Sequence, residues 1–196
     1  MAAATTPTKE ELERVKIVLG DALPYELAML DRAARNMQTP QFQQLKIEQD
    51  PSDWLTHNAM VEAFWTHARC LLEFFNASKR NNFGSSSASA RDLTTNAYSP
   101  SAEIQKLWGP GKLSEKINEQ ISHVGFCRKA ELYEKLGPQM GHVKNTIDKE
   151  TKAFAGALRP EFQQYWKWQP RKEAFVAVYN SSGTASCPEI VVLNLF

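Results

Sequence analysis

Apolar residues recur at helical spacing along most of the first 158 positions of this chain. The pattern is strongest between Asp53 and about Asn76, where apolar positions cover a wide arc of a helix: Val61, Phe64, Trp65, Ala68, Leu71, Leu72 and Phe75. A helix that is apolar over so much of its circumference needs neighbours on several sides. The sequence therefore predicts a long central helix over 53–76.

Two shorter helices are predicted before it. Thr8 followed three positions later by Glu11 has the form of a capping box, so we expect a helix to begin there. Gly20 suits the end of that helix. Pro24 is compatible with the first turn of a second helix, and apolar residues then recur at helical spacing over 25–37.

The second half of the chain alternates between helical and irregular patterns. Residues 78–101 are rich in Ser, Asn, Ala and Gly and have no periodic apolar face, so we expect a mobile loop over about 78–107, with a functional lid as the alternative. Apolar spacing then predicts a helix over about 112–124 and a last long helix over 143–158, which Pro160 stops.

The C-terminal segment differs in composition from everything before it. Residues 173–179 and 189–193 are rich in β-branched and aromatic residues and flank a turn-prone spacer. We therefore predict a mainly α fold, an up-down bundle of four to six helices over 1–160. A C-terminal extension over 161–196 is expected to contain a short β-hairpin.

Composition and charge narrow the class of protein. Apolar residues make up 42% of the 196 positions and the formal net charge is +1, so any contact with nucleic acid would need a local basic patch. The longest aliphatic run, 190–193, is too short to span a bilayer, and the N-terminus lacks the pattern of a secretory signal. Three widely spaced cysteines suit a reducing compartment. We expect a cytoplasmic protein that does not enter the membrane.

A polar stripe runs along the central helix, formed by Glu62, Thr66, Arg69 and Glu73. Glu62 and Arg69 are nearly two turns apart, so both can project toward one site. His67 falls between Phe64 and Leu71 on the apolar side and is expected to be half buried. The competing interpretation is an internal ion pair with a hydrogen-bonded core histidine.

A second polar stripe follows the Trp108-Gly-Pro-Gly111 segment. Lys116 and His123 are seven residues apart and lie on almost the same face of the predicted helix. Asn118 between them is unfavourable inside a helix, which indicates a specific use. The competing interpretation is an ordinary solvated helix face.

Together the two stripes resemble a known family of small, mostly uncharacterised bacterial helical proteins that is similar to the HEPN superfamily. The resemblance rests on Glu62-x-Phe-x-x-His67-Ala-Arg69-x-Leu-x-x-Phe74, then a Trp and Leu113-x-x-x-Ile-Asn118-x-x-Ile-x-His123. Tyr25-Glu-Leu-x-Met-Leu30 also resembles the N-terminal helix of that family. The resemblance covers roughly residues 22–158.

The resemblance implies a helical bundle that forms a homodimer and cleaves RNA without a metal. His123 would be the catalytic histidine, and Lys116 would occupy the position of the family's arginine. Asn118 would position the phosphate or the histidine, Glu62 would supply the polar residue of the long helix, and Arg69 would bind phosphate together with Lys116. Lysine keeps the charge but loses the planar fork of arginine, so a non-catalytic dimerisation or protein-interaction module is the alternative.

Other classes of enzyme fit the sequence poorly. The four histidines form no HExxH motif and the cysteines form no CxxC motif, so we predict no metal site. A glycine-rich nucleotide loop and a Gly-x-Ser-x-Gly elbow are also missing from the sequence, and we predict no cofactor.

Overall fold

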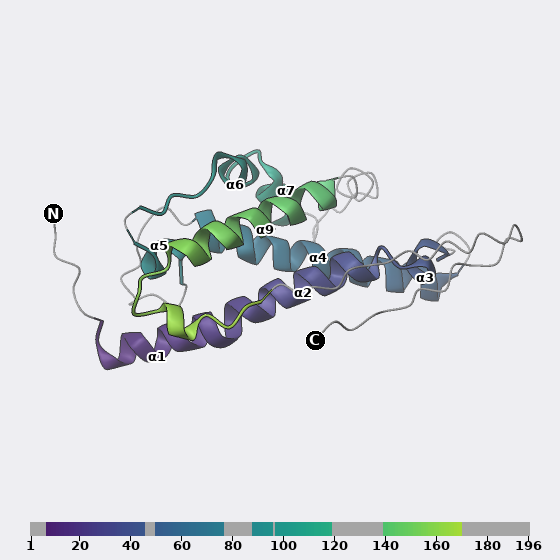
Figure 1. Cartoon of the computed structure of the whole chain (residues 1–196). Coiled ribbons are helices and arrows are strands. Elements are labelled where there is room, and N and C mark those ends of the chain that lie inside the picture. Colours follow the sequence, from purple (N-terminus) through teal and green to yellow (C-terminus); the bar gives the residue numbers. More distant parts are fainter. Residues whose placement is uncertain (1–6, 46–49, 77–87, 96, 119–138, 170–196) are drawn as a thin grey trace, which may run out of the picture.

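The chain is mainly helical, as the apolar spacing predicts. The computed structural model describes residues 7–45, 50–76, 88–95, 97–118 and 139–169. In chain order its elements are α1 (Lys9–Ile17), η1 (Val18–Ala22), α2 (Leu23–Asn36), α3 (Pro40–Gln43), α4 (Pro51–Asn76), α5 (Ala90–Leu93), α6 (Ala102–Leu107), α7 (Leu113–Ile117), α9 (Met140–Ala157) and η4 (Gln163–Tyr165) (Figure 1). The predicted C-terminal hairpin lies outside the described residues.

The first two predicted helices form one continuous rod. The capping box at Thr8 is present: the Glu11 N–H donates to Thr8 Oγ1 at 3.2 Å, and the Thr8 N–H donates to Glu11 Oε2 at 2.7 Å. The predicted end at Gly20 is wrong, because the π-helical turn η1 carries the chain directly from α1 into α2.

Pro24 accounts for this wider turn. A proline inside an α-helix lacks an N–H and its ring clashes with the carbonyl four residues earlier, which here belongs to Gly20. In η1 the Leu23 N–H donates to Val18 O, five residues back, so the helix is widened just before the proline. The chain therefore accommodates Pro24 without ending the helix.

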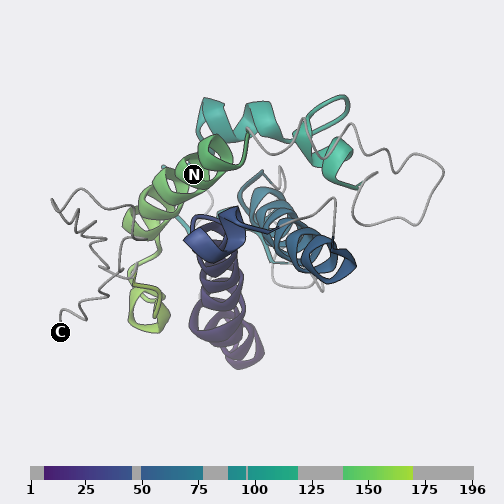
Figure 2. The same cartoon turned by 90° about the vertical axis from the view of Figure 1, so that its right-hand side faces the viewer.

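The central helix is confirmed. Helix α4 runs over 26 residues and contacts α2, α5, α6, α7 and α9. Its buried residues cover the wide arc that the sequence predicts: Val61, Phe64, Trp65, Ala68, Leu71, Leu72, Phe74 and Phe75. Figure 2 shows α2, α4 and α9 side by side, and each of these three helices contacts the other two. The core lies between them, and each fully buried large side chain contributes about 1.5–3 kcal/mol.

Residues 88–107 differ from the featureless loop that the composition suggests. They include α5 and α6, which both contact α4, and they bury Leu93, Tyr98 and Ile104. Thr94 forms an isolated antiparallel bridge with Leu158, in which the Arg159 N–H donates to Leu93 O at 3.1 Å. This segment is thus held against the end of α9, and the loop expectation is too wide at its C-terminal side.

A buried polar pair fixes the same segment to the middle of α9. Glu150 is 2% exposed, and it accepts hydrogen bonds from the Tyr98 hydroxyl at 2.7 Å and from the Ser101 N–H at 3.2 Å. Burial raises the pKa of Tyr98 well above its usual range, and the hydrogen bond to Glu150 and that carboxylate's charge raise it further. The apolar spacing along α9 gives no indication of this glutamate's partners.

Candidate functional site

The polar stripe on α4 lies at the surface of the bundle rather than inside it. Glu62 and Arg69 are half buried, whereas Thr66 and Glu73 are exposed. Arg69 Nη2 lies 3.8 Å from Glu73 Oε2, and the two side chains are 32% and 53% exposed. An ion pair this exposed contributes little to stability, so it does not by itself explain the position of Arg69. Although the side chain as a whole is 32% exposed, Arg69 Nε is sealed from solvent and has no hydrogen-bond partner among the described residues.

His67 is half buried, as predicted, and it has a specific partner. Its Nδ1 lies 2.7 Å from Glu26 Oε2 of α2, and the histidine side chain is 12% exposed. The Tyr25 ring meets the imidazole edge-on, with centroids 5.7 Å apart. The pair joins α2 to α4, which supports the interpretation of His67 as a core histidine. The sequence places Glu26 in the N-terminal motif but gives no indication of this pairing.

Cys70 lies one turn after His67 and is half buried. Burial raises the pKa of its thiol, and the carboxylate of Glu26 raises it further. A thiol that is kept protonated is a poor nucleophile. Cys70 is therefore a packing residue on this apolar helix.

The second stripe begins on α7, a short helix whose start is fixed by the loop before it. Gly109 and Gly111 adopt positive φ angles of 120° and 70°, which favour glycine. The Gly109 N–H donates to Ser114 Oγ at 2.9 Å, and the Gly111 N–H donates to the Glu115 carboxylate. Ile117 is fully buried and holds α7 in the core, where the helix contacts α4.

Lys116 and Asn118 lie on either side of this buried isoleucine. Lys116 is exposed and makes no ion pair with any residue that the structure describes. Asn118 is half buried, and its Oδ1 is sealed from solvent with no hydrogen-bond partner within the described ranges. A buried amide oxygen without a partner is unfavourable by about 1–3 kcal/mol, and such groups in folded proteins call for an explanation.

The structure thus brings the helices of the two stripes into contact, because α7 packs on α4. Lys116 and Asn118 belong to one of these helices, and Glu62 and Arg69 belong to the other. His123 lies outside the described residues, and its role remains a prediction from the sequence.

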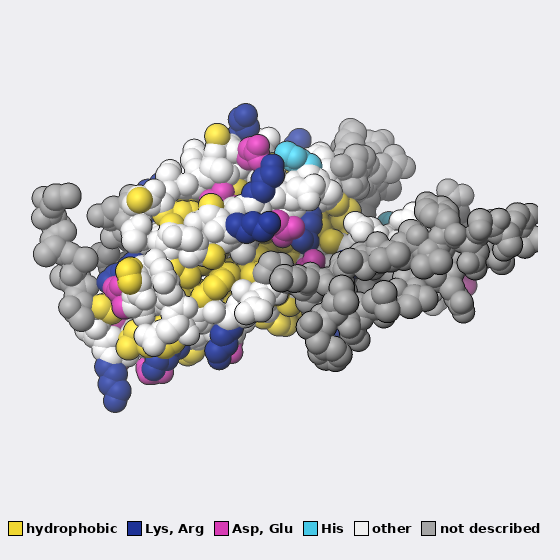
Figure 3. All heavy atoms as spheres, viewed as in Figure 1, with side chains coloured by type: hydrophobic (Ala, Val, Ile, Leu, Met, Phe, Trp, Pro, Cys, Tyr) yellow, Lys and Arg dark blue, Asp and Glu magenta, His cyan; other side chains and the backbone are white. Residues whose placement is uncertain are grey.

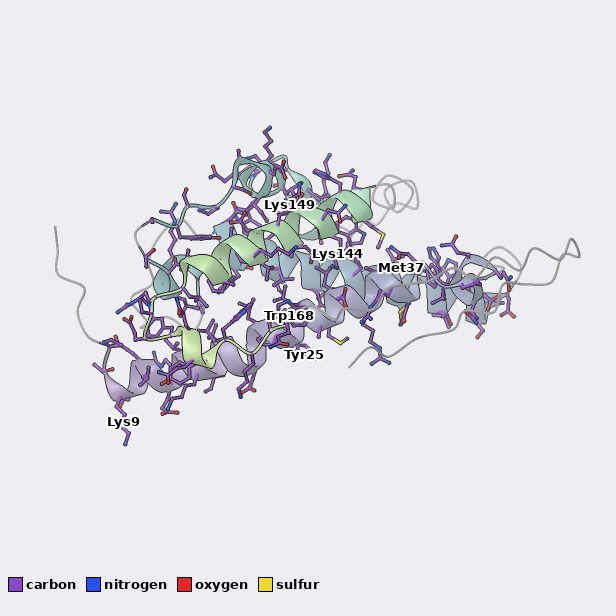
Figure 4. All side chains as sticks on the ribbon, viewed as in Figure 1. Lys9, Tyr25, Met37, Lys144, Lys149 and Trp168 are labelled. Carbon is purple, nitrogen blue, oxygen red and sulfur yellow. The ribbon has the colours of Figure 1, made fainter. Side chains whose placement is uncertain are left out.

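A second cluster of polar and aromatic residues lies away from both stripes. A pocket of about 240 Å³ opens between α2, α9 and the segment that follows η4. We call it the tryptophan pocket; its principal residues are Asp31, Lys144, Asp148, Lys152, Trp166 and Trp168. Figure 4 labels Lys144 on α9 and Trp168 on the chain that passes over α2. From the sequence, Trp166 and Trp168 suggest exposed or packing aromatic surface, but nothing indicates that Asp31 and α9 join them.

Comparisons with known proteins identify no family for this chain. No family model matches the sequence, and neither a curated protein nor a solved structure matches it. In the described part of the chain, no helix is long and apolar enough to cross a membrane. Those same residues contain no group of three or more His, Cys, Asp or Glu that could hold a metal ion.

Proposed function

We propose that this chain is a HEPN-like helical protein that cleaves RNA without a metal, using Lys116, Asn118 and His123 in a cleft between two copies. The observation that carries the proposal is the sealed, unpartnered Oδ1 of Asn118, one residue beyond a helix that is fixed in the core. An amide oxygen in this state has an unused acceptor position, which a catalytic side chain packed against it could fill. The exposed ammonium of Lys116 stands two residues before it.

The chemistry requires one proton acceptor, one proton donor and a cation. The imidazole of His123 takes the proton from a ribose 2′-hydroxyl, and the 2′-oxygen attacks the adjacent phosphorus. The bond to the 5′-oxygen breaks, and that oxygen takes the proton that the His123 imidazole received, which returns the imidazole to its neutral form. The products are a 2′,3′-cyclic phosphate and a free 5′-hydroxyl. Lys116 and Arg69 stabilise the negative charge that develops on the phosphate oxygens.

The dimer is part of the proposal because the resemblance places the cleft between two copies. Trp54 and Leu55 at the start of α4 support an interface, since their side chains are 52% and 62% exposed and adjacent. Tyr25 is 57% exposed farther along the bundle. The alternative, a non-catalytic interaction module, is favoured by these same exposed apolar residues and by lysine in the arginine position.

The test is incubation of single-stranded RNA with the full chain in the presence of EDTA. Cleavage by the wild type, with loss of activity in His123→Ala and Lys116→Ala, is the expected result. Lys106→Ala is the matched control, because Lys106 is an exposed helical lysine on α6. Lys116→Arg should keep or increase the rate, since arginine restores the bidentate grip on phosphate.

Three outcomes would contradict the proposal. One is equal cleavage by the wild type and by His123→Ala, which would point to a contaminating nuclease. Another is a strictly monomeric protein by analytical ultracentrifugation over a range of concentrations. The third is a dimer that binds no RNA and cleaves none, which would favour the non-catalytic module.

A further inference from the structure

The tryptophan pocket presents two indole rings from one short segment. Trp166 and Trp168 are half buried and separated by a single residue. Trp166 meets the fully buried ring of Phe154 in a T-shaped contact, with centroids 5.6 Å apart and planes at 69°. Phe154 itself contacts Phe74, Phe75 and Tyr98 in the core. The first indole is therefore held in a fixed orientation before any ligand arrives.

The charged groups around these rings are mostly paired with one another. Lys144 Nζ lies 2.6 Å from Asp148 Oδ2 and 3.5 Å from Asp31 Oδ1. The other carboxylate oxygen of Asp31, Oδ2, forms an ion pair with Arg35 Nη2 at 2.9 Å. Two carboxylates thus balance two cations, and this group of four carries no net charge.

Lys152 is the exception at the pocket. It lies on α9 one turn after Asp148, is exposed, and makes no ion pair within the described part of the chain. Figure 3 shows lysine and arginine side chains with neighbouring carboxylates over α9, the helix that carries Lys144, Lys149 and Lys152. The pocket therefore combines two aromatic rings with one uncompensated positive charge at its border.

We propose that the tryptophan pocket binds a nucleotide, with the base against the indole rings and the phosphate at Lys152. Aromatic side chains stack with any nucleobase, because every base has a π-face. A lysine ammonium binds phosphate as a point charge. A cationic ligand would suit the indoles, but its charge would lie beside the Lys152 ammonium. The volume of about 240 Å³ is below that of pockets for drug-sized ligands, so it suits a single base.

The nucleotide can come from two sources with the same chemistry: a free nucleoside monophosphate or one unpaired nucleotide of single-stranded RNA. The second source would make the pocket a substrate-binding site of the proposed ribonuclease. The binding itself uses only Trp166, Trp168, Lys152 and their neighbours and does not involve His123 or Lys116. The proposal for the pocket and the proposal for RNA cleavage can therefore be disproved independently of each other.

Isothermal titration calorimetry on the full chain separates the parts of the ligand. We expect AMP to bind, adenosine to bind more weakly, and ribose 5-phosphate, which has no base, to bind least. Lys152→Ala should weaken AMP binding while leaving the affinity for adenosine unchanged. Trp168→Ala should lower the affinity for both AMP and adenosine about 5- to 150-fold, which is the effect of losing one stacking partner. Trp168→Phe, which keeps a ring and the fold, should lose less than Trp168→Ala.

Lys149→Ala is the matched control, because Lys149 is a highly exposed lysine of the same helix whose carboxylate neighbour is Glu103, at 3.9 Å, outside the pocket. A higher affinity for a short oligoadenylate than for AMP would assign the site to RNA. An affinity for AMP that equals or exceeds that for the oligoadenylate would assign the site to a free nucleotide. The proposal is overturned if neither binds. It is also overturned if Lys149→Ala and Lys152→Ala weaken AMP binding equally, or if ribose 5-phosphate binds as tightly as AMP. His123→Ala should bind AMP like the wild type, whatever its effect on cleavage.

Discussion

Replacing Asn118 by leucine should make the protein more stable and less active. Asn118 is half buried at the end of α7, and its Oδ1 has no partner among the described residues. Leucine has a similar size, removes the unsatisfied oxygen and has a higher helix propensity. If the amide were kept for packing alone, this exchange would have no functional cost. If the amide serves RNA cleavage, stability and activity should change in opposite directions.

The size of the effect follows from two contributions. Leaving a buried polar atom without a hydrogen bond is unfavourable by about 1–3 kcal/mol, and the half-buried side chain places Asn118 at the lower end of that range. The propensity difference between Asn and Leu adds about 0.5 kcal/mol. Together they predict stabilisation of about 1.5 kcal/mol. For a chain of this length that corresponds to an increase in Tm of roughly 3–6 °C.

The assay is thermal unfolding followed by circular dichroism, with RNA cleavage measured on the same preparations. Asn145→Leu is the matched control, because Asn145 is an exposed residue within α9 and reports the propensity contribution alone. We expect Asn118→Leu to exceed that control by about 1 kcal/mol and to lose cleavage activity. The reasoning is refuted if Asn118→Leu lowers Tm, which would show that the amide is satisfied and structural. Equal stabilisation by both variants would refute the magnitude.

The other predictions concern the core and its polar contacts. Tyr98→Phe should cost about 1.5–3 kcal/mol at neutral pH in urea unfolding, because it removes a hydrogen bond to the buried Glu150 carboxylate. The pKa of Tyr98 is raised in the folded state, so above about pH 10 this tyrosine ionises in the unfolded chain but stays protonated in the folded protein. The free energy of unfolding of the wild type should therefore fall faster with pH in that range than that of Tyr98→Phe. Phe154→Ala should cost about 3–5 kcal/mol by the same method, as a fully buried ring is lost, and it should also weaken AMP binding by releasing Trp166. With Cys127 and Cys187 replaced by serine, Cys70 should react with iodoacetamide more slowly than a free thiol at pH 7, because its pKa is raised; a rate equal to that of free cysteine would contradict the burial argument.

The fold could be predicted where one physical signal dominated. In α4 the wide apolar arc identifies both the helix and its central place, because such a surface has to be covered on several sides. Thr8 marks the start of α1 for a similarly local reason, since the capping box needs only residues three apart. The helix end predicted at Gly20 is wrong, because the π-helical turn that accommodates Pro24 continues the helix past this glycine.

Residues 88–107 could not be predicted, because their stability comes from contacts distant in sequence. The hydrogen bond from Tyr98 to Glu150 joins residues 52 positions apart, and the bridge from Thr94 to Leu158 spans a similar distance. Local composition does not indicate such distant partners, so a Ser- and Ala-rich segment is predicted to be a loop. The same limit applies to the tryptophan pocket, where Asp31 of α2 meets residues of α9 and of the segment after η4.

Charge compensation connects the two proposed sites. Most cations near them are paired: Lys144 with Asp31 and Asp148, and Arg69 with Glu73. Lys116 and Lys152 are uncompensated within the described residues, and each lies beside groups that suit a nucleotide. A net charge of +1 offers no long-range attraction to RNA, so these local cations would have to supply the phosphate contacts. With Arg69, which is also proposed to contact phosphate, the described residues supply three contacts, and three contacts to a single strand correspond to a slope of log K against log salt of about −2.1. This slope is shallow compared with that of a basic RNA-binding domain. Binding by this protein therefore depends on stacking and positioning more than on its electrostatic field, and it should persist at salt concentrations that release a purely electrostatic complex.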